Sequence, residues 1–446
     1  MLIHAVVHNR CVLAFTLGAL LLIAAERSVF AQNTNSGSNN SSASSNPQSS
    51  GPASPPAAEP ALPEGFLPEP HVITRAIDYV TNTFGDGTNQ MKSGFYPEFS
   101  NMISGSGWLS AGPGYRQYFS DDRILVDGSA ALSWHLYKMV QGRFELPTLA
   151  DDHLVVGAQG MWQDATQVNY FGIGTDSLEA NRSQYRIQTT DVVGYATIKP
   201  YTWLSIGSEV GFLKQPKIME PGGTFVGDFP TTQNEFPADP GVSLTSQPNF
   251  WHTEESVTAD TLNHHSYPST GGLYRAAFTS YDDRDTGTFS FSQYEAEGEQ
   301  FIPLADRRVV LGFRGWTLYS NVPAGNQIPF YLLPSLGGNN TLRDFHSYQF
   351  HDNNLLVVNA ESRFLLYRHL DLAVFFDAGN VAPTFKELNL DQTSYGAGVR
   401  LHTDTHTFGR VDVAYGSEGW RFVARTSDPF RLSREKRRVA AVPFMP

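Results

Sequence analysis

Side chains able to do chemistry are sparse in this sequence, and the best spaced of them are His402, Asp404 and His406. Residues two apart share one face of a β-strand, so these three could ligate a metal. The threonines between them and the glycine at position 409 fit a polar strand rim equally well. We expect no metal site there.

A second polar cluster, Asp283, Asp285 and Gly287, resembles the start of a calcium loop but lacks the terminal glutamate that such a loop needs. It fits a solvated hairpin turn better. The sequence contains no nucleophile elbow, phosphate-binding glycine loop or zinc-protease motif. We therefore expect no catalytic site, no cofactor and no enzymatic activity.

Three glutamates alternate along one predicted strand, at Glu295, Glu297 and Glu299. The alternation places three like charges on one strand face. Such a face suits a water-filled lumen, which either simply solvates the charges or favours the passage of cations.

The composition is that of a folded chain without covalent cross-links. Of its 446 residues, 17% are charged and 13% are aromatic, which is far from a disordered composition. The single cysteine, Cys11, falls in the leader described next, so we expect no disulfide or thiolate ligand in the mature chain. A net charge of -13 argues against nucleic acid as a partner, because phosphate binding needs clustered lysine and arginine.

The N-terminal part of the sequence predicts export and spacer segments. Residues 1–31 combine a weakly basic start, an apolar stretch and a small residue before a cut, which is typical of a signal peptide; an uncleaved anchor helix is the alternative. Residues 32–70 have almost nothing to bury and predict a disordered periplasmic linker. Residues 71–91 place apolar side chains at helical spacing and predict a short pre-barrel helix, either capping a barrel or plugging its lumen.

Residues 92–430 consist of short alternating segments broken by turn residues, which is a β-rich pattern. In residues 355–366 the even positions are apolar, whereas Glu361 stands on the opposite face. In residues 370–377 the even positions are again apolar, and Asp377 stands on the opposite face. The same alternation recurs at residues 309–314 and 395–402.

Full charges on one face of segment after segment favour a lipid-spanning barrel with a wet lumen over a soluble sandwich. Aromatic residues near segment ends are expected to form girdles at the membrane interfaces: Trp108, Trp134, Tyr170, Trp203, Trp316 and Trp420. A sheet in lipid must close, because an open edge leaves backbone groups unpaired in hydrocarbon. The residues thus predict an all-β, transmembrane antiparallel β-barrel of about twelve to eighteen strands.

Four motifs follow one another in the C-terminal part of the sequence. Residues 336–345 read LGGNNTLRDF, and they are followed by NAESR at 359–363, FDAGNV at 376–381 and YGAGVR at 395–400. In order and spacing these motifs resemble those of the BamA/TamA bacterial surface antigen superfamily. The resemblance covers most of residues 92–430 and implies an outer-membrane barrel of about sixteen strands, with an inward-folded loop bearing the LRDF motif.

The resemblance gives Arg343 a structural role. In the family, the arginine of this loop meets acidic side chains in the lumen, and the strand alternation turns Glu361 and Asp377 inward. We expect a bidentate, charge-assisted contact here; an ordinary exposed loop arginine is the alternative. The family motif residues are Gly337, Gly338, Leu342, Arg343, Phe345, Asp377 and Gly379.

The sequence departs from the family pattern in three places. Asp344 stands where the family has glycine, which puts a tight backbone approach in doubt. Residues 431–446 form a basic C-terminal tail beyond the expected last strand, so Phe430 or Phe444 would serve as the terminal aromatic. No periplasmic POTRA module fits before residue 92, so we expect full insertase or secretion activity only if a separate chain supplies such modules.

These features favour a barrel of the bacterial outer membrane that acts in outer-membrane protein assembly or translocation, through a weak seam between its first and last strands. A passive pore or structural barrel is the alternative, and a secreted soluble β-rich enzyme is the third reading. The expected partners are outer-membrane lipid and either client outer-membrane proteins or a separate periplasmic module.

Overall fold

In the computed structural model, the described residues are 63–84, 93–98, 110–223, 229–244, 247–425, 428–430, 438–440 and 442–444. The expected signal peptide, most of the expected linker, Trp108 and most of the basic tail lie outside these residues. None of the helices in the described ranges is long and apolar enough to cross a membrane.

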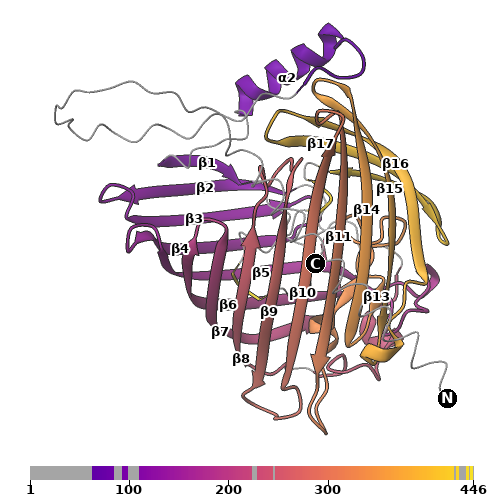
Figure 1. The fold of residues 1–446 in the computed structure, drawn as a ribbon. Coiled ribbons are helices and arrows are strands. Elements are labelled where there is room, and N and C mark those ends of the chain that lie inside the picture. The colour runs from indigo at the N-terminus through magenta and orange to yellow at the C-terminus, as the bar shows by residue number, and fades with distance from the viewer. Residues whose placement is uncertain are drawn as a thin grey trace, which may run out of the picture. The chain divides into compact units, whose positions relative to one another are not determined.

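A single antiparallel sheet of sixteen strands forms the body of the described chain (Figure 1). Each strand pairs with the next one along the chain, except that β11 pairs with β14. The strands are β1 (Gly94–Glu98), β2 (Ser110–Phe119), β3 (Ile124–Ser133), β4 (Lys138–Leu149), β5 (Leu154–Tyr170), β6 (Ser183–Tyr201), β7 (Leu204–Met219), β8 (Phe250–Asp260), β9 (Gly271–Asp283), β10 (Phe291–Leu304), β11 (Val309–Asn321), β14 (Asn354–Tyr367), β15 (Leu370–Ala382), β16 (Gln392–His402), β17 (Thr407–Gly416) and β18 (Gly419–Arg425). The sheet curls strongly, so that β2–β6 run across the view of Figure 1 while β9–β11 run along it.

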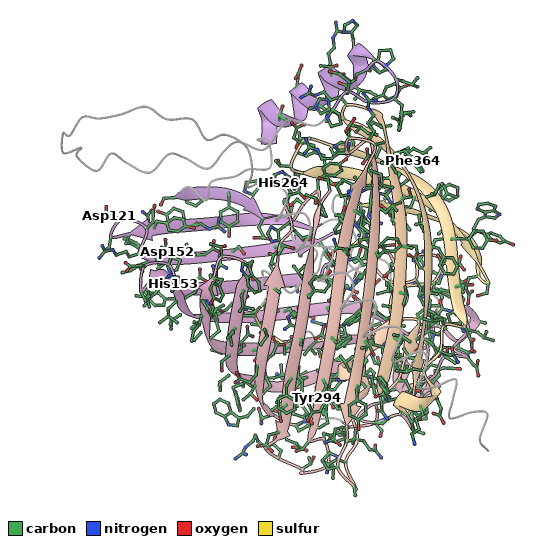
Figure 2. The ribbon with its side chains drawn as sticks, in the orientation of Figure 1. Asp121, Asp152, His153, His264, Tyr294 and Phe364 are labelled. Carbon is green, nitrogen blue, oxygen red and sulfur yellow. The ribbon has the colours of Figure 1, made fainter. Side chains whose placement is uncertain are left out.

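The alternation predicted from the sequence is confirmed in the strands that carry the motifs. In β14 the odd-numbered side chains, including Glu361 and Arg363, are buried, and the even-numbered ones are more exposed. In β15 the odd-numbered side chains, including Asp377, are buried, whereas Leu372 and Val374 are exposed. The concave face of the sheet therefore carries the charges, and the outer face carries apolar side chains such as Tyr294 on β10 (Figure 2).

The predicted aromatic girdle is only partly correct. Trp134, Trp203 and Trp420 are exposed near strand ends, as expected. Tyr170 and Trp316 are instead fully buried on the concave side, so their assignment to the girdle was wrong. The Tyr170 hydroxyl donates to Asp239 at 2.5 Å, and the Trp316 indole donates to Glu295 at 2.9 Å. Each ring thus has a polar partner inside the curl, which stabilises it there.

The long connection between β11 and β14 packs on the concave face. It contains a short 3-10 helix, η2 (Phe330–Leu332), and a two-stranded ribbon of β12 (Ser335–Leu336) and β13 (Phe350–His351). Phe330 and its neighbours join Leu213 and Phe250 of the sheet in one apolar cluster. Leu342 and Phe345 of the same connection join Trp316 and Val357 in a second cluster. The interior is therefore packed on apolar contacts around the charged residues described below.

Residues before the sheet form α2 (His71–Phe84), which lies beyond the β14–β15 turn (Figure 1). The backbone amides of Phe66 and Leu67 donate to the carbonyls of Leu365 and Leu366, each at 2.9 Å. Glu69 accepts a hydrogen bond from the His369 amide at 2.9 Å. These contacts tie the segment just before α2 to the β14–β15 turn.

The same carboxylate shows how the attachment is stabilised. Burial alone would raise the pKa of Glu69, but hydrogen bonds from His369 and Thr74 outweigh it and lower the pKa below its ordinary value. The charged form of Glu69 is therefore favoured by the docked segment. A smaller element, α3 (Thr232–Glu235), and two further single-turn segments, η1 (Glu179–Asn181) and η3 (Phe385–Glu387), lie in the loops at the opposite end.

A charge on the outer face should be costly if that face meets lipid. Val374 is 44% exposed in the middle of β15, opposite Ser362 and Ala397. We expect Val374→Arg to cost about 2–4 kcal/mol of stability in a bilayer. The folded fraction, measured as heat-modifiable migration after membrane insertion, should fall, whereas Glu387→Arg in the exposed η3 turn should have no effect. Equal yields of the two variants would contradict a lipid-facing outer surface.

Candidate functional site

The loop that carries the LRDF motif is a tight turn built on two glycines. Gly337 and Gly338 have φ values of 107° and 99°, which strain any residue with a Cβ. A Cβ on Gly337 would lie 2.3 Å from the His346 carbonyl oxygen. The Gly337 amide donates to the Thr341 hydroxyl at 3.0 Å, and the Gly338 amide donates to the Leu342 carbonyl at 3.1 Å. This turn presents residue 343 to the concave face of the sheet.

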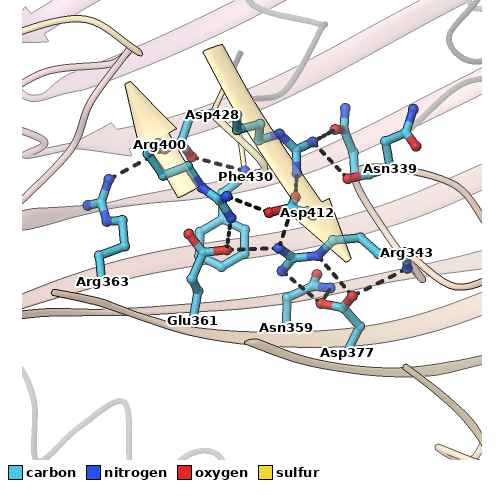
Figure 3. Close-up of polar contacts among 12 residues, drawn as sticks. Asn339, Arg343, Asn359, Glu361, Arg363, Asp377, Arg400, Asp412, Asp428 and Phe430 are labelled. Carbon is cyan, nitrogen blue, oxygen red and sulfur yellow. Dashed lines mark hydrogen bonds and ion pairs between the residues drawn. The ribbon is translucent and has the colours of Figure 1, made fainter. Parts of the chain in front are cut away.

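Arg343 makes a fork-shaped contact with two carboxylates on neighbouring strands (Figure 3). Its Nε and Nη2 donate to the two oxygens of Asp377 on β15, each at 3.0 Å. Its Nη1 donates to Glu361 on β14 at 2.8 Å. The structure thus brings together the three residues that the sequence singled out, and the loop is joined to two strands by one side chain.

The residues of this contact are buried and make further contacts with their neighbours. Arg343, Glu361 and Asp377 are each buried. The guanidinium carbon lies 3.6 Å from the centre of the Phe375 ring, a cation–π stacking distance. Asn359 donates to Asp377 at 2.8 Å and to the Thr341 carbonyl at 2.7 Å. Each group that holds Arg343 is therefore held in turn by a second contact.

The contact extends into a larger charged cluster that the sequence analysis did not predict. Arg400 on β16 donates to Glu361 at 2.9 Å and also pairs with Asp412 on β17. Arg410 on β17 donates to Asp412 at 2.7 Å and to the Asn339 carbonyl of the loop at 2.8 Å. Three arginines thus balance three carboxylates across β14, β15, β16 and β17. Arg410 and Asp412 lie two residues apart, so the sequence alone places them on the same face of a strand. Which residues they pair with depends on the register of the neighbouring strands.

Asp344, which replaces the family glycine, has a role of its own. Its φ is not positive, so the position does not require glycine. Its amide donates to the Ser394 hydroxyl at 3.1 Å, and its carboxylate accepts the Glu418 amide at 3.1 Å. Asp344 therefore extends the attachment of the loop from β16 to the β17–β18 turn.

The remaining motif residues are structural. Leu342 and Phe345 are buried in the apolar cluster around Trp316. A Cβ on Gly379 of β15 would lie 2.7 Å from the Leu356 carbonyl oxygen, so this position needs glycine for close strand packing.

Several side chains of the other polar clusters named from the sequence have charged or aromatic partners in the protein. Glu297 pairs with Arg314 at 2.6 Å and Glu295 with Arg275 at 3.2 Å. His402 lies 3.3 Å from Asp371 and stacks on the Tyr267 ring at 4.0 Å. These pairs leave less excess negative charge than the sequence suggested.

The cluster at residues 283–287 closes a hairpin turn. The Asp283 carboxylate accepts the backbone amides of Asp285 and Thr286, each at 2.9 Å. Among the residues that the structure describes, no group of three or more His, Cys, Asp or Glu side chains could hold a metal ion.

Phe430, one of the two residues expected to serve as the terminal aromatic, does not lie in a strand. β18 ends at Arg425, and Phe430 packs against Phe301 and Val310 on the concave side. Asp428, just before it, lies 3.5 Å from Arg363. The chain therefore turns inward after β18 rather than ending at the outer face.

Comparison with known proteins defines the class to which this fold and loop belong. Residues 162–420 match the Omp85 superfamily domain, which is more than half of the chain. The chain therefore belongs to the Omp85 superfamily, as the resemblance to BamA and TamA implied. A comparison with curated proteins found no match.

A solved BamA structure has the same fold. The chain is similar to BamA from Haemophilus ducreyi lacking POTRA domains 1-3, with a TM-score of 0.55 and 13% identity over 80% of this chain and 82% of that one. It is also similar to CdiB from Escherichia coli, with a TM-score of 0.46 and 11% identity over 72% of this chain and 58% of that one.

Family membership settles the location and the broad class. Omp85 barrels reside in the bacterial outer membrane. They are transport and assembly proteins rather than enzymes, which agrees with the lack of catalytic motifs in the sequence.

Removing the central guanidinium should destabilise the fold. Arg343→Ala leaves Asp377 buried without an ion partner and Glu361 paired with Arg400 alone, at a cost of about 3–5 kcal/mol. We expect a lower yield of folded protein and a lower urea midpoint in unfolding followed by tryptophan fluorescence. The control is Arg284→Ala, which removes an exposed ion pair with Asp282 and should change stability by less than about 1 kcal/mol. Equal midpoints for the two variants would show that the Arg343 contact contributes nothing.

Proposed function

We propose that this chain is a closed outer-membrane barrel that assists the assembly or translocation of outer-membrane proteins by opening between β1 and β18. In this proposal the LRDF loop lies in the lumen and holds the C-terminal strands while the seam opens. The observation that carries the proposal is the contrast between weak terminal strands and a strongly braced C-terminal half.

The first hairpin is weak for reasons that its residues make clear. β1 has five residues and β18 has seven, whereas β10 has fourteen. Pro97 of β1 lies directly opposite Pro113 of β2. Because proline has no backbone N–H, neither Pro97 nor Pro113 can donate a backbone hydrogen bond to a neighbouring strand. β1, the shortest strand of the sixteen-stranded sheet, therefore offers few backbone hydrogen bonds to any partner strand.

The opposite side of the proposed seam is held by charge. Arg343 joins the loop to β14 and β15, Arg400 joins β14 to β17, and Asp344 reaches the β17–β18 turn. Opening on this side would break buried ion pairs, whereas opening at β1 would break few backbone hydrogen bonds. The barrel would therefore open at β1, and the C-terminal strands would stay in place.

The contrast between the short first hairpin and the ion-paired C-terminal strands favours lateral opening over a passive pore. A pore needs a continuous path through the interior, and here the β11–β14 connection packs apolar side chains across the concave face. The pore reading predicts that the seam can be locked without loss of function. The two readings therefore separate in one experiment.

The experiment is a reversible cross-link across the seam. Cysteine pairs with one partner in β1 and one in β18 would be introduced into a Cys11→Ser background, and oxidation should abolish the protein's function. The readout is rescue of the envelope defect of a strain that lacks the protein, measured as the abundance of its outer-membrane proteins. Reduction of the disulfide should restore function.

The matched control locks strands that are not expected to separate. Tyr294 and Tyr319 are exposed partners on β10 and β11. The disulfide of Tyr294→Cys with Tyr319→Cys should leave function intact. If a complete seam cross-link also leaves it intact, lateral opening is not the mechanism and the pore reading replaces it.

A further inference from the structure

The basic tail, expected to lie beyond the last strand, in part occupies the interior of the sheet. Residues 438–440 and 442–444 are described, and the side chains of Val439, Val442 and Phe444 are 4%, 1% and 7% exposed. Val439 and Val442 belong to the same apolar cluster as Leu213 and Phe250. The apolar residues of this basic segment are thus buried against the sheet.

One side of this segment binds polar residues of β5, β6 and β7. The Arg438 guanidinium donates to Glu209 at 2.9 Å and lies 5.0 Å from the centre of the Tyr195 ring. The Ala440 amide donates to Asp191 at 2.7 Å. These three contacts come from one wall of the sheet, and each uses a charged or aromatic partner.

Two glutamines on β5 continue this wall. The Arg438 amide donates to the Gln159 side chain at 3.0 Å, and the Gln163 side chain donates to the Val442 carbonyl. The segment thus uses its backbone groups as well as its side chains, in the manner of a bound extended peptide.

The other side of the segment contacts β11 and the β11–β14 connection. The Phe444 amide donates to the Tyr331 carbonyl at 2.9 Å, and the Ser335 hydroxyl donates to the Phe444 carbonyl at 3.3 Å. The Phe444 ring stacks parallel to Trp316, with ring centres 6.2 Å apart. The segment therefore bridges two opposite parts of the interior.

A cavity of about 440 Å³ lies beside this bridge. Arg438, Val439, Ala440 and Phe444 form part of its lining, and the rest comes from β6–β11 and the turns at their ends. Glu254 and Thr258 on β8 are among these lining residues. Removal of the segment would join the cavity to the space that the segment fills.

We propose that the concave faces of β5–β7 and the β11–β14 connection form a binding site for an extended peptide, and that residues 438–440 and 442–444 occupy this site as a displaceable plug. The wall of the site is built from side chains that water can also satisfy, namely Gln159, Gln163, Asp191 and Glu209. Such a wall tolerates both the occupied and the empty state, unlike an apolar core. This site does not depend on the seam between β1 and β18, so either proposal can fail alone.

The test measures whether the segment shields the wall. Gln163→Cys, in the Cys11→Ser background, would be labelled with a water-soluble maleimide in purified, detergent-folded protein. In the full chain labelling should be slow, and in a variant truncated after Phe430 it should be faster by on the order of tenfold or more. Thr258→Cys, which lines the cavity without a contact to the segment, should label at the same rate in both backgrounds.

Binding in trans completes the test. A synthetic peptide of residues 431–446 should protect Gln163→Cys in the truncated variant, whereas the same peptide carrying Val442→Asp and Phe444→Ala should not. Full-length protein with these two substitutions should label as fast as the truncated variant, which covers the case that truncation impairs folding. If the folded variants label no faster than the full chain, or if the peptide gives no protection, the plug proposal is overturned.

Discussion

The arrangement of the C-terminal half depends on keeping a buried guanidinium neutralised. Arg343 lies among Glu361, Asp377 and Asp412, and Arg400 and Arg410 complete the balance of charge. A charge removed from water is stable only when every partner stays in place. The cluster therefore fixes the loop, the register of β14–β17 and the position of the β17–β18 turn together, because displacing one member leaves the others unpaired.

This constraint explains why the molecule is asymmetric. The C-terminal strands are joined by ion pairs on their concave face, whereas the first hairpin is short and has two opposed prolines. The interior between the two halves is filled by the β11–β14 connection and by Val439 and Val442. In the proposed opening, the charged half would stay intact, and changes would be required at the N-terminal edge of the sheet and in its interior.

The sequence predicted the fold well because strand alternation is local. The parity of residues 355–366 and 370–377 placed Glu361 and Asp377 inward, and the loop motif supplied Arg343. Trp316 was assigned to the girdle although it lies two residues from the inward Arg314 on the same strand. The alternation therefore predicts that Trp316 also points inward, as the structure shows.

What the sequence could not give is how distant segments meet. The pairing of Arg400 with Glu361 depends on the relative shift of three strands, which no local pattern fixes. The sequence predicted a basic tail beyond the last strand, and no local pattern predicted that Val439, Val442 and Phe444 are buried against the sheet. Such residues are buried only because the sheet provides a wall that fits them.

Hydrogen exchange of the folded barrel tests the central claim most directly, since it reports the local stability of each strand. The account predicts that amides of β14–β17 are the most protected and those of β1 among the least, and that Arg343→Ala selectively lowers protection in β14–β17 while β5–β7 stay unchanged. Uniform protection across the sheet, or an equal loss in β5–β7, would contradict it.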